Sequence, residues 1–402
     1  MSVATVKLFH ADPYQSEFNA HVVSCVPSGT GWDVVLDQTL FYADSGGQPS
    51  DSGSLAQRRV LAVREDEAGV IVHTVDGPLD GEISGAVDRV RRLDHMWQHT
   101  GQHLLSGVFA HLLNAETVSW HLGTESCTID LAIEALSMEQ VEQIELECNR
   151  VIRACLPVVT HLVDETGLAA LPVRKPPAVT DNIRVVEILG YDWSACAGTH
   201  VRNTGELGLL KVKAWERNKR FTRVEFLVGN RAIGDYIALD RLTRDLCRSL
   251  SIAVLELPRY VERSQEEGSA LRKQVKFLQE RILEAEALEL IANGRKVAGA
   301  TIVRLVLGGR PLEDVKLLAA KVASHNGTVA VFGTKGAIPQ VILYRSVDLR
   351  IDVGGILRQV LPLIDGRGGG SPVQAQGGGS RPEALEAALD QAIQKVSEAL
   401  HQ

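Results

Sequence analysis

The sequence predicts an α+β protein of several domains, in which a small amino-terminal β-barrel is followed by an α+β domain, a helical linker and a carboxy-terminal α/β domain. Three observations lead to this prediction. The chain of 402 residues is too long for one ordinary core. Short strand patterns fill its first part, and two later stretches combine helical and strand patterns in different ways. With 45% hydrophobic and 23% charged residues, the composition is that of an ordinary globular protein.

Residues 1–88 have the pattern of short β-strands. The segments HVVSCV, WDVVLDQ, RRVLAVR and GVIVHTV are separated by Gly, Pro and Asp turns, and no long helical pattern interrupts them. Closely spaced short strands are typical of a small barrel or sandwich. We therefore assign residues 1–88 to a β-barrel domain.

Residues 89–230 combine helices with strands. Apolar residues recur at helical spacing from Leu93 to Asn114, and Val118, Trp120 and Leu122 then alternate in a hairpin. Ser-Met-Glu-Gln at Ser137 forms a capping box for a second helix, which we expect to run until Pro157. Further strands are predicted at 183–189, 208–215 and 221–228. This order predicts an α+β domain.

Residues 231–292 read as a helical linker. Its second part carries a near-heptad apolar stripe, made of Leu271, Val275, Leu278, Ile282, Ala285 and Leu288. Such a stripe is either a coiled-coil dimer seam or one face packed within the chain, and the short run favours the second. In residues 293–402 the strands TIVRLVL, TVAVFGT and QVILYRS alternate with helices at 312–325, 352–364 and 382–400, which predicts an α/β domain with one glycine-rich loop, GRGGGSPVQAQGGG.

Charge and composition narrow the function classes. The net charge of −8 argues against nucleic-acid binding over the whole surface, although local basic clusters can still contact RNA. These are Arg89, Arg91 and Arg92, then Lys211, Lys213, Arg217, Lys219, Arg220 and Arg223, and finally Arg295 with Lys296. No stretch is apolar enough to span a membrane, the opening lacks the build of a secretory signal, and the six cysteines are scattered. We expect a cytoplasmic protein with free thiols and no membrane partner.

Two short motifs point to a metal. His99-Thr-Gly-Gln-His103 places two imidazoles on one helix face, and Cys196-Ala-Gly-Thr-His200 adds a thiolate and a third imidazole. Three nitrogen ligands and one sulfur ligand suit Zn2+. His95 lies on the same helix, so spacing alone leaves His95/His99 and His99/His103 both open as the helical ligand pair.

The two motifs resemble the HxxxH and CxxxH halves of the editing domain shared by alanyl-tRNA synthetase, the AlaX proteins and, more distantly, threonyl-tRNA synthetase. The resemblance implies that the zinc ligands are His99, His103, Cys196 and His200, and that His95 lies outside the site. With four protein ligands, a hydrolytic site needs either an exchangeable ligand or a metal that expands its coordination, and we expect His200 to be the most loosely held of the four.

Three further stretches extend the resemblance over nearly the whole chain. Phe41-Tyr42 followed by SGGQPSD at 45–51 is similar to the glycine-rich segment of the alanine-specific branch. The hairpin VSWHLGTESCTIDL resembles one wall of the editing pocket, and GRGGGSPVQAQGGG resembles the loop of the DHH-associated carboxy-terminal domain. The chain departs from the family's usual CGGTH at Ala197 and from a third glycine at Ser45. Both departures leave the ligand types intact.

The resemblance to a long-form AlaX protein implies a zinc-dependent aminoacyl-tRNA deacylase that acts in trans on mischarged tRNA(Ala). A pocket for alanine discriminates poorly against serine and glycine, so we expect Ser-tRNA(Ala) as the chief substrate and Gly-tRNA(Ala) as the second. We place His121, Gln48, Thr100 and Thr128 at the substrate as candidate catalytic residues. A homodimer through the helical linker and the last domain also fits the family.

The main alternative is a non-catalytic, zinc-containing protein that binds tRNA or dimerises. A closed and inert four-ligand site would favour it, whereas a metal site at the floor of a pocket would favour the hydrolase. We do not expect ligase activity, because no aminoacylation core precedes the barrel. A phosphoesterase is not expected either, since the Asp-His-His motif of that class is absent from the sequence.

Overall fold

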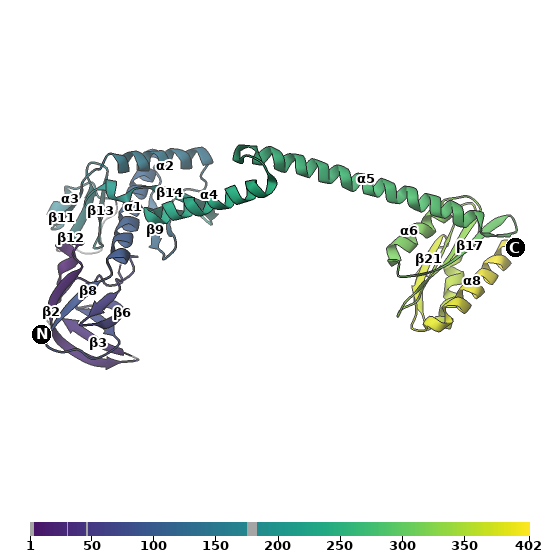
Figure 1. Cartoon of the computed structure of the whole chain (residues 1–402), viewed down its shortest axis with the longest axis horizontal. Helices are drawn as coiled ribbons and strands as arrows, with labels where there is room; N and C mark the ends of the chain where they lie inside the picture. The colour runs from purple at the N-terminus through teal and green to yellow at the C-terminus, as the bar shows by residue number, and fades with distance from the viewer. Residues whose placement is uncertain (1–3, 30, 46, 175–182) are drawn as a thin grey trace. The chain divides into compact units, whose positions relative to one another are not determined.

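The computed structural model describes residues 4–29, 31–45, 47–174 and 183–402. The chain divides into two compact units, Met1–Ser251 and Ile252–Gln402. Figure 1 labels many of the helices and strands of both units. Within the described ranges, no helix is both long enough and apolar enough to cross a membrane.

The first unit begins with the predicted β-barrel, which is confirmed. Its closed strand order is β2 (Glu17–Ser28), β3 (Gly31–Leu36), β7 (Ile71–Val75), β6 (Arg58–Glu65), β5 (Gly53–Leu55) and β8 (Glu82–Val87). A separate parallel pair is formed by β1 (Val6–Lys7) and β4 (Gln38–Thr39). In the sequence, β1 precedes the barrel strands and β4 lies between β3 and β5. Buried and less buried residues alternate along β7, as expected when one face of a strand lines a filled barrel.

Helix α1 (Arg89–Leu113) follows the barrel directly and forms the centre of the first unit. It begins a full turn before the predicted Leu93, because the Asp88 side chain accepts hydrogen bonds from the backbone N–H groups of Val90 and Arg91. Asn114, in the left-handed region with φ of 50°, ends it. Its middle is buried on nearly all sides, so polar side chains there must find partners inside the protein.

Two sheets and three helices surround α1. One sheet has the order β14 (Leu210–Asn218), β15 (Phe221–Val228), β10 (Cys127–Leu131) and β9 (Thr117–Leu122), and the other has β11 (Val158–Val163), β12 (Ile183–Ile188) and β13 (Asp192–Ala195). The helices are α2 (Met138–Arg153), α3 (Glu165–Ala169) and α4 (Asn230–Leu250). The capping box at Ser137 is confirmed. Helix α2 ends four residues before Pro157, and Cys155 there has a φ of 50° that no helix continues.

The second unit is the predicted α/β domain. Its sheet has the order β16 (Arg295–Val297), β17 (Ala300–Gly308), β18 (Thr328–Lys335), β19 (Gln340–Arg345), β21 (Gln374–Gly378) and β20 (Arg367–Gly370), with helices α6 (Leu312–Ala323), α7 (Val353–Val360) and α8 (Leu385–Leu400) packed on it. The glycine-rich stretch, predicted as a loop, instead forms the antiparallel pair β20–β21. Three backbones pass closely there, and a Cβ at Gly370 would lie 2.2 Å from a backbone oxygen.

The predicted linker consists of α4 in the first unit and α5 (Leu257–Ala292) in the second. Leu283, Ala287, Leu290 and Ile291 pack α5 against α6 and the sheet. The six residues of the near-heptad stripe lie on other faces and are exposed in the part of the chain that the structure describes; Ile282 is 64% and Leu278 is 48% exposed. The favoured expectation, a stripe packed within the chain, is therefore wrong for the described residues.

Candidate metal centre

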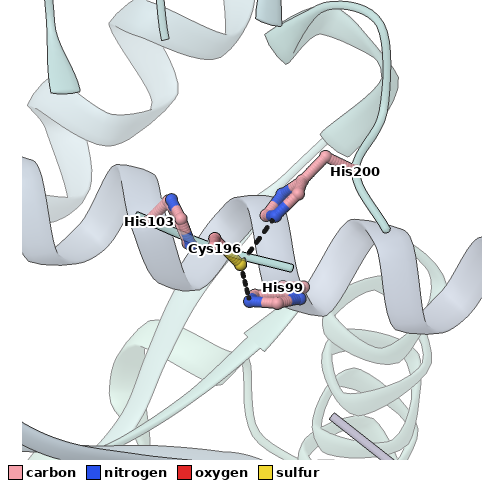
Figure 2. A group of neighbouring side chains, drawn as sticks. All are labelled: His99, His103, Cys196 and His200. Carbon is pink, nitrogen blue, oxygen red and sulfur yellow. Dashed lines mark hydrogen bonds between the residues drawn. The ribbon is translucent and has the colours of Figure 1, made fainter. Parts of the chain in front are cut away.

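Four side chains converge beside the middle of α1. His99 and His103 come from successive turns of the helix, Cys196 follows directly after β13, and His200 lies four residues further on. One potential ligand atom from each of the four lies within 4.8 Å of all the others. The Cys196 Sγ is 3.3 Å from the Nε2 atoms of both His99 and His200. Figure 2 shows the three imidazoles gathered around the thiol.

The cluster settles which histidines of α1 belong together. His103 is a member, whereas His95, one turn before His99, is not. His95 is also buried, and its Nδ1 atom has no hydrogen-bond partner within the described residues. The structure thus groups the pair that the family resemblance selected.

Gln48, from the segment between β4 and β5, orients His99. The Gln48 side chain is fully buried, and its Oε1 accepts from the backbone N–H of Thr199 at 3.1 Å, so this atom is the amide oxygen. The same oxygen is 2.8 Å from the His99 Nδ1. Because a carbonyl oxygen only accepts, the Nδ1 donates, and the lone pair of the ring lies on Nε2, facing the cluster.

Thr100 orients His200 in a similar way. The Thr100 hydroxyl is 3.1 Å from the His200 Nδ1 and accepts from the backbone N–H of Val201 at 3.2 Å. The His200 Nε2 is left to face Cys196. Gln48 and Thr100, both expected at the substrate, thus lie behind the cluster and hold its histidines.

The loop that carries Cys196 is held by its carbonyl groups. Arg184 donates through Nη1 to the carbonyl oxygens of Cys196 and Gly198, at 2.8 and 2.9 Å, and the His10 Nε2 lies 3.0 Å from the carbonyl oxygen of Ala197. A Cβ at Gly198 would lie 2.2 Å from the His99 ring, so only glycine fits there.

The departures from the family motifs are accommodated. Ala197 is exposed and has no positive φ, so its methyl group neither strains the loop nor crowds the cluster. Ser45 is likewise exposed and free of positive φ. The neighbouring Gly46 lies outside the described residues.

The local charges suit a cation. Burial raises the pKa of the Cys196 thiol, but the adjacent His99 and His200 outweigh this and hold that pKa well below its usual range. Burial lowers the pKa values of His99 and His200. At His103, burial is outweighed by the Asp192 carboxylate and by Cys196, and the pKa rises to about 9. A thiolate and converging imidazole nitrogens form a donor set that fits zinc.

A pocket of about 350 Å³ opens on the cluster. Its lining includes two cluster residues and four residues of β9, and it consists of Gly47, Gln102, His103, Thr117, Val118, Ser119, Trp120, Arg174, Ser194, Ala195 and Cys196. The Trp120 ring lies against His99, with ring centroids 4.9 Å apart. The cluster therefore forms part of a pocket wall and is not sealed in the core.

His121 and Thr128 do not reach this pocket. They face each other across β9 and β10, and neither is among the pocket's lining residues. His121 is exposed, and Thr128 lines a different hollow together with Trp215 and Arg223. The structure thus separates these two candidates from the other site residues.

Sequence reasoning missed Asp192, Arg174 and Arg184, which contact the cluster or its loop. Asp192 comes from β13, Arg174 from the segment before residue 175 and Arg184 from β12, and each is a single charged residue without periodicity. The signal that the sequence offered was an aspartate four residues before a candidate cysteine ligand, and this signal is weak. Trp120 was predicted in a hairpin but was not assigned to the pocket.

Five of the eleven residues in the basic clusters considered for RNA form ion pairs within the described residues. Arg92 forms a buried ion pair with Asp51. On β14 and β15, the basic side chains pair with acidic ones: Lys211 with Glu145, Lys213 with Glu225 and Asp235, Arg217 with Glu134, and Arg223 with Asp130. Only Lys219 and Arg220 of that cluster have no ion pair within the described ranges.

Two family models match the chain. Residues 183–225 match the threonyl and alanyl tRNA synthetase second additional domain, and residues 306–398 match the DHHA1 domain. The solved C-Ala domain of Aquifex aeolicus alanyl-tRNA synthetase aligns with 27% of this chain and 98% of that chain, at 22% identity and a TM-score of 0.25.

The relatives differ in how much of their own length this chain covers. The chain is 32% identical to the alanine–tRNA ligase of Methanoregula boonei over 98% of its own length but only 44% of the ligase. It is 30% identical to the alanyl-tRNA editing protein AlaX-L of Pyrococcus horikoshii, over 97% of this chain and 98% of that protein. The chain therefore belongs to the AlaX-L family of alanyl-tRNA editing proteins.

Proposed function

We propose that this chain hydrolyses the ester bond of mischarged tRNA(Ala), with Ser-tRNA(Ala) as its chief substrate and Gly-tRNA(Ala) as its second. One observation carries the proposal: nitrogen atoms of three imidazoles and a thiol converge, and two of these four residues line an open pocket. His99, His103, Cys196 and His200 would hold a zinc ion, which would supply Lewis acidity to the aminoacyl ester.

The other residues have supporting roles in this proposal. Gln48 and Thr100 fix the orientation of His99 and His200, so the ligand set is formed before substrate arrives. Arg184 keeps the Cys196 loop in place through its carbonyl groups. Trp120 and Gly47 bound the space beside the cluster, which favours small aminoacyl groups.

His200 remains our choice for the ligand that yields when substrate enters. Its Nδ1 contacts only a neutral hydroxyl, which already accepts a backbone hydrogen bond, whereas His103 faces a carboxylate. A carboxylate partner makes an imidazole a stronger ligand than a hydroxyl does. His200 would therefore be the weakest of the three nitrogen ligands.

The non-catalytic alternative predicts a closed site. Cys196 and His103 instead line an open pocket, which gives a substrate direct access to the ligand atoms. This observation favours the hydrolase over a structural metal site in a protein that only binds tRNA.

The test is the release of labelled serine from Ser-tRNA(Ala), with bound zinc measured in the same samples. We expect the wild-type chain to deacylate Ser-tRNA(Ala), to act more slowly on Gly-tRNA(Ala), and to spare Ala-tRNA(Ala). Cys196→Ala should lose zinc and activity together, while the matched variant Cys25→Ala, altered in the barrel, keeps both. A wild-type chain that binds zinc but releases no serine contradicts the proposal and leaves the tRNA-binding alternative.

We also propose that the chain forms a homodimer through the exposed stripe of α5. Large apolar side chains spaced at near-heptad intervals lose contact with water when two such helices pair. Ile282→Glu should shift the protein from dimer to monomer in sedimentation velocity, and Gln279→Glu on the same helix should not. A wild-type chain that sediments as a monomer at micromolar concentration contradicts this proposal.

A further inference from the structure

Asp192 lies behind His103, on the side away from the other ligands. It is the first residue of β13, and its side chain is fully buried. The Asp192 Oδ2 is 3.6 Å from the His103 Nδ1. Within the described residues, that Nδ1 is buried and has no hydrogen-bond partner. The carboxylate thus lies next to the one ligand histidine whose Nδ1 has no hydrogen-bond partner.

The carboxylate of Asp192 is itself held from the opposite side. Arg174 donates to it through Nε and, at 3.3 Å, through Nη2, and the Ser194 hydroxyl donates at 3.0 Å. Arg174 also donates to Ser194 at 2.7 Å. Asp192 therefore forms a buried ion pair with Arg174, and this pair holds its carboxylate in one orientation.

Helix α1 leaves room for this carboxylate. Gly107 is one turn beyond His103, and a Cβ at that position would lie 3.2 Å from the Asp192 Cβ and 3.3 Å from its Oδ1. These distances are tighter than ordinary carbon contacts, so any side chain at position 107 would push Asp192 away. The sequence therefore provides both the acceptor and the space that it needs.

We infer that Asp192 is a positioning residue for His103, and that Arg174 and Ser194 fix its carboxylate in the required orientation. By accepting the Nδ1 proton, Asp192 would leave the lone pair of the ring on Nε2, directed at the cluster. This completes a pattern in which each ligand histidine has its own partner: an amide for His99, a hydroxyl for His200 and a carboxylate for His103. The inference rests on the proposed function, because it assumes that the cluster holds a metal.

A matched arrangement elsewhere in the same unit provides the control. Asp130 on β10 accepts from Arg223 at 2.7 and 2.8 Å and from the Ser119 hydroxyl at 2.7 Å. It therefore has the same kinds of partner as Asp192, one arginine and one serine. No histidine shares its ion pair within the described part of the chain. A purely structural role for Asp192 would make the two aspartates equivalent.

The experiment measures zinc affinity by competition with a chelator, using the full chain. Asp192→Asn should bind zinc 10- to 100-fold more weakly than wild type, on the order expected for loss of an outer partner of a ligand histidine. It should also alter the absorption spectrum of the cobalt-substituted site, which reports ligand geometry. Asp130→Asn should change neither measurement. Equal zinc affinity in Asp192→Asn and wild type would overturn the inference.

A second variant keeps the test valid if Asp192→Asn folds poorly. Gly107→Ala retains every charge and displaces Asp192 from His103, so it should also weaken zinc binding while the metal-free protein melts near the wild-type temperature. Gly107→Ala with wild-type affinity and cobalt spectrum counts against the inference. A wild-type chain that binds no zinc would instead refute the proposed function, so the two failures are distinguishable.

Discussion

The barrel and the domain that carries the metal cluster contribute to one site in different ways. All four candidate ligands come from the second region, on α1 and on the loop after β13. The barrel region contributes contacts to the ligands: Gln48 to His99 and His10 to the Cys196 loop. The barrel region is therefore part of the site's framework, although it provides no ligand among the described residues.

A buried ion pair joins the two regions beside the cluster. Arg92, on the first turn of α1, donates to Asp51 at 3.1 Å and to the carbonyl oxygen of Pro13 at 2.9 Å. Asp51 also accepts from the backbone N–H of Tyr42 at 2.7 Å. The SGGQPSD segment thus binds α1 twice, through Asp51 at the base of the helix and through Gln48 at His99. The predictions below test this division of roles, beginning with the largest effect.

The largest effect should come from the ligands themselves. His99→Ala and His103→Ala should abolish stoichiometric zinc binding and serine release, because each removes one of only four donors. His95→Ala, on the same helix, should retain zinc. Metal analysis of the purified variants checks this, and zinc loss in His95→Ala alone would show that the ligand pair is wrongly assigned.

The second-largest effect should come from the ion pair between Arg92 and Asp51, which joins α1 to the barrel region. Arg92→Met leaves the buried Asp51 carboxylate without its partner, and removing one member of a buried pair costs roughly 3–5 kcal/mol. Urea unfolding of the metal-free protein measures the loss. Arg263→Met, which breaks an exposed pair on α5, serves as the control and should leave the free energy of unfolding almost unchanged. Equal losses in both variants would remove the special role of the Asp51 contact.

The barrel should lose stability in mild acid through His73. Burial lowers the pKa of this histidine from 6.5 to about 4. Between pH 6.5 and pH 4, His73 is protonated in the unfolded chain but neutral in the folded barrel. The contribution of His73 to the free energy of unfolding is therefore unchanged above pH 6.5 and falls by roughly 3 kcal/mol as the pH drops to 4. In His73→Gln, unfolding free energy measured from pH 7 to 4 should depend less steeply on pH. An unchanged slope would mean that other groups dominate acid unfolding.

A smaller effect is expected from Gln48. Gln48→Leu keeps the volume but removes the acceptor for the His99 Nδ1, so zinc affinity should fall about 10- to 100-fold. Gln38→Leu, a glutamine on β4 that donates to the Asn19 carbonyl, should bind zinc like wild type. Chelator competition distinguishes them. If Gln48→Leu binds zinc normally but loses serine release, Gln48 contacts substrate as the sequence first suggested.

The smallest effect is expected from the outer face of the hairpin. His121→Ala and Thr128→Ala should change the deacylation rate by no more than about twofold, the range of an ordinary surface substitution. Both residues lie outside the pocket lining. A large rate loss in either variant, with zinc retained, would restore it as a catalytic candidate.

Spacing in the sequence predicted much of the fold, and together with the family resemblance it predicted all four members of the cluster. Periodicity located the barrel and α1, because burial on one face repeats at a fixed interval. The HxxxH spacing identified possible ligands, and the family resemblance decided between His95 and His103. The order of the elements could also be read directly, since each is a continuous segment.

The pocket and the hydrogen bonds that orient the ligand histidines could not be predicted from spacing or periodicity. Gln48 meets Thr199 across 151 positions, and Arg174 meets Asp192 across 18 positions, so no local pattern connects them. The same limit explains His121: strand alternation shows that neighbouring residues point to opposite faces, but not which face lines a pocket. The stripe on α5 failed for a related reason, since an apolar repeat does not specify its partner.

The most direct test of metal-dependent editing is a zinc titration of the metal-stripped chain, with serine release from Ser-tRNA(Ala) as the readout. We predict no release without metal, a rise in rate that follows zinc binding, and saturation at one zinc per chain. A metal-free chain that releases serine at the full rate would contradict the claim that these four residues form a catalytic metal centre.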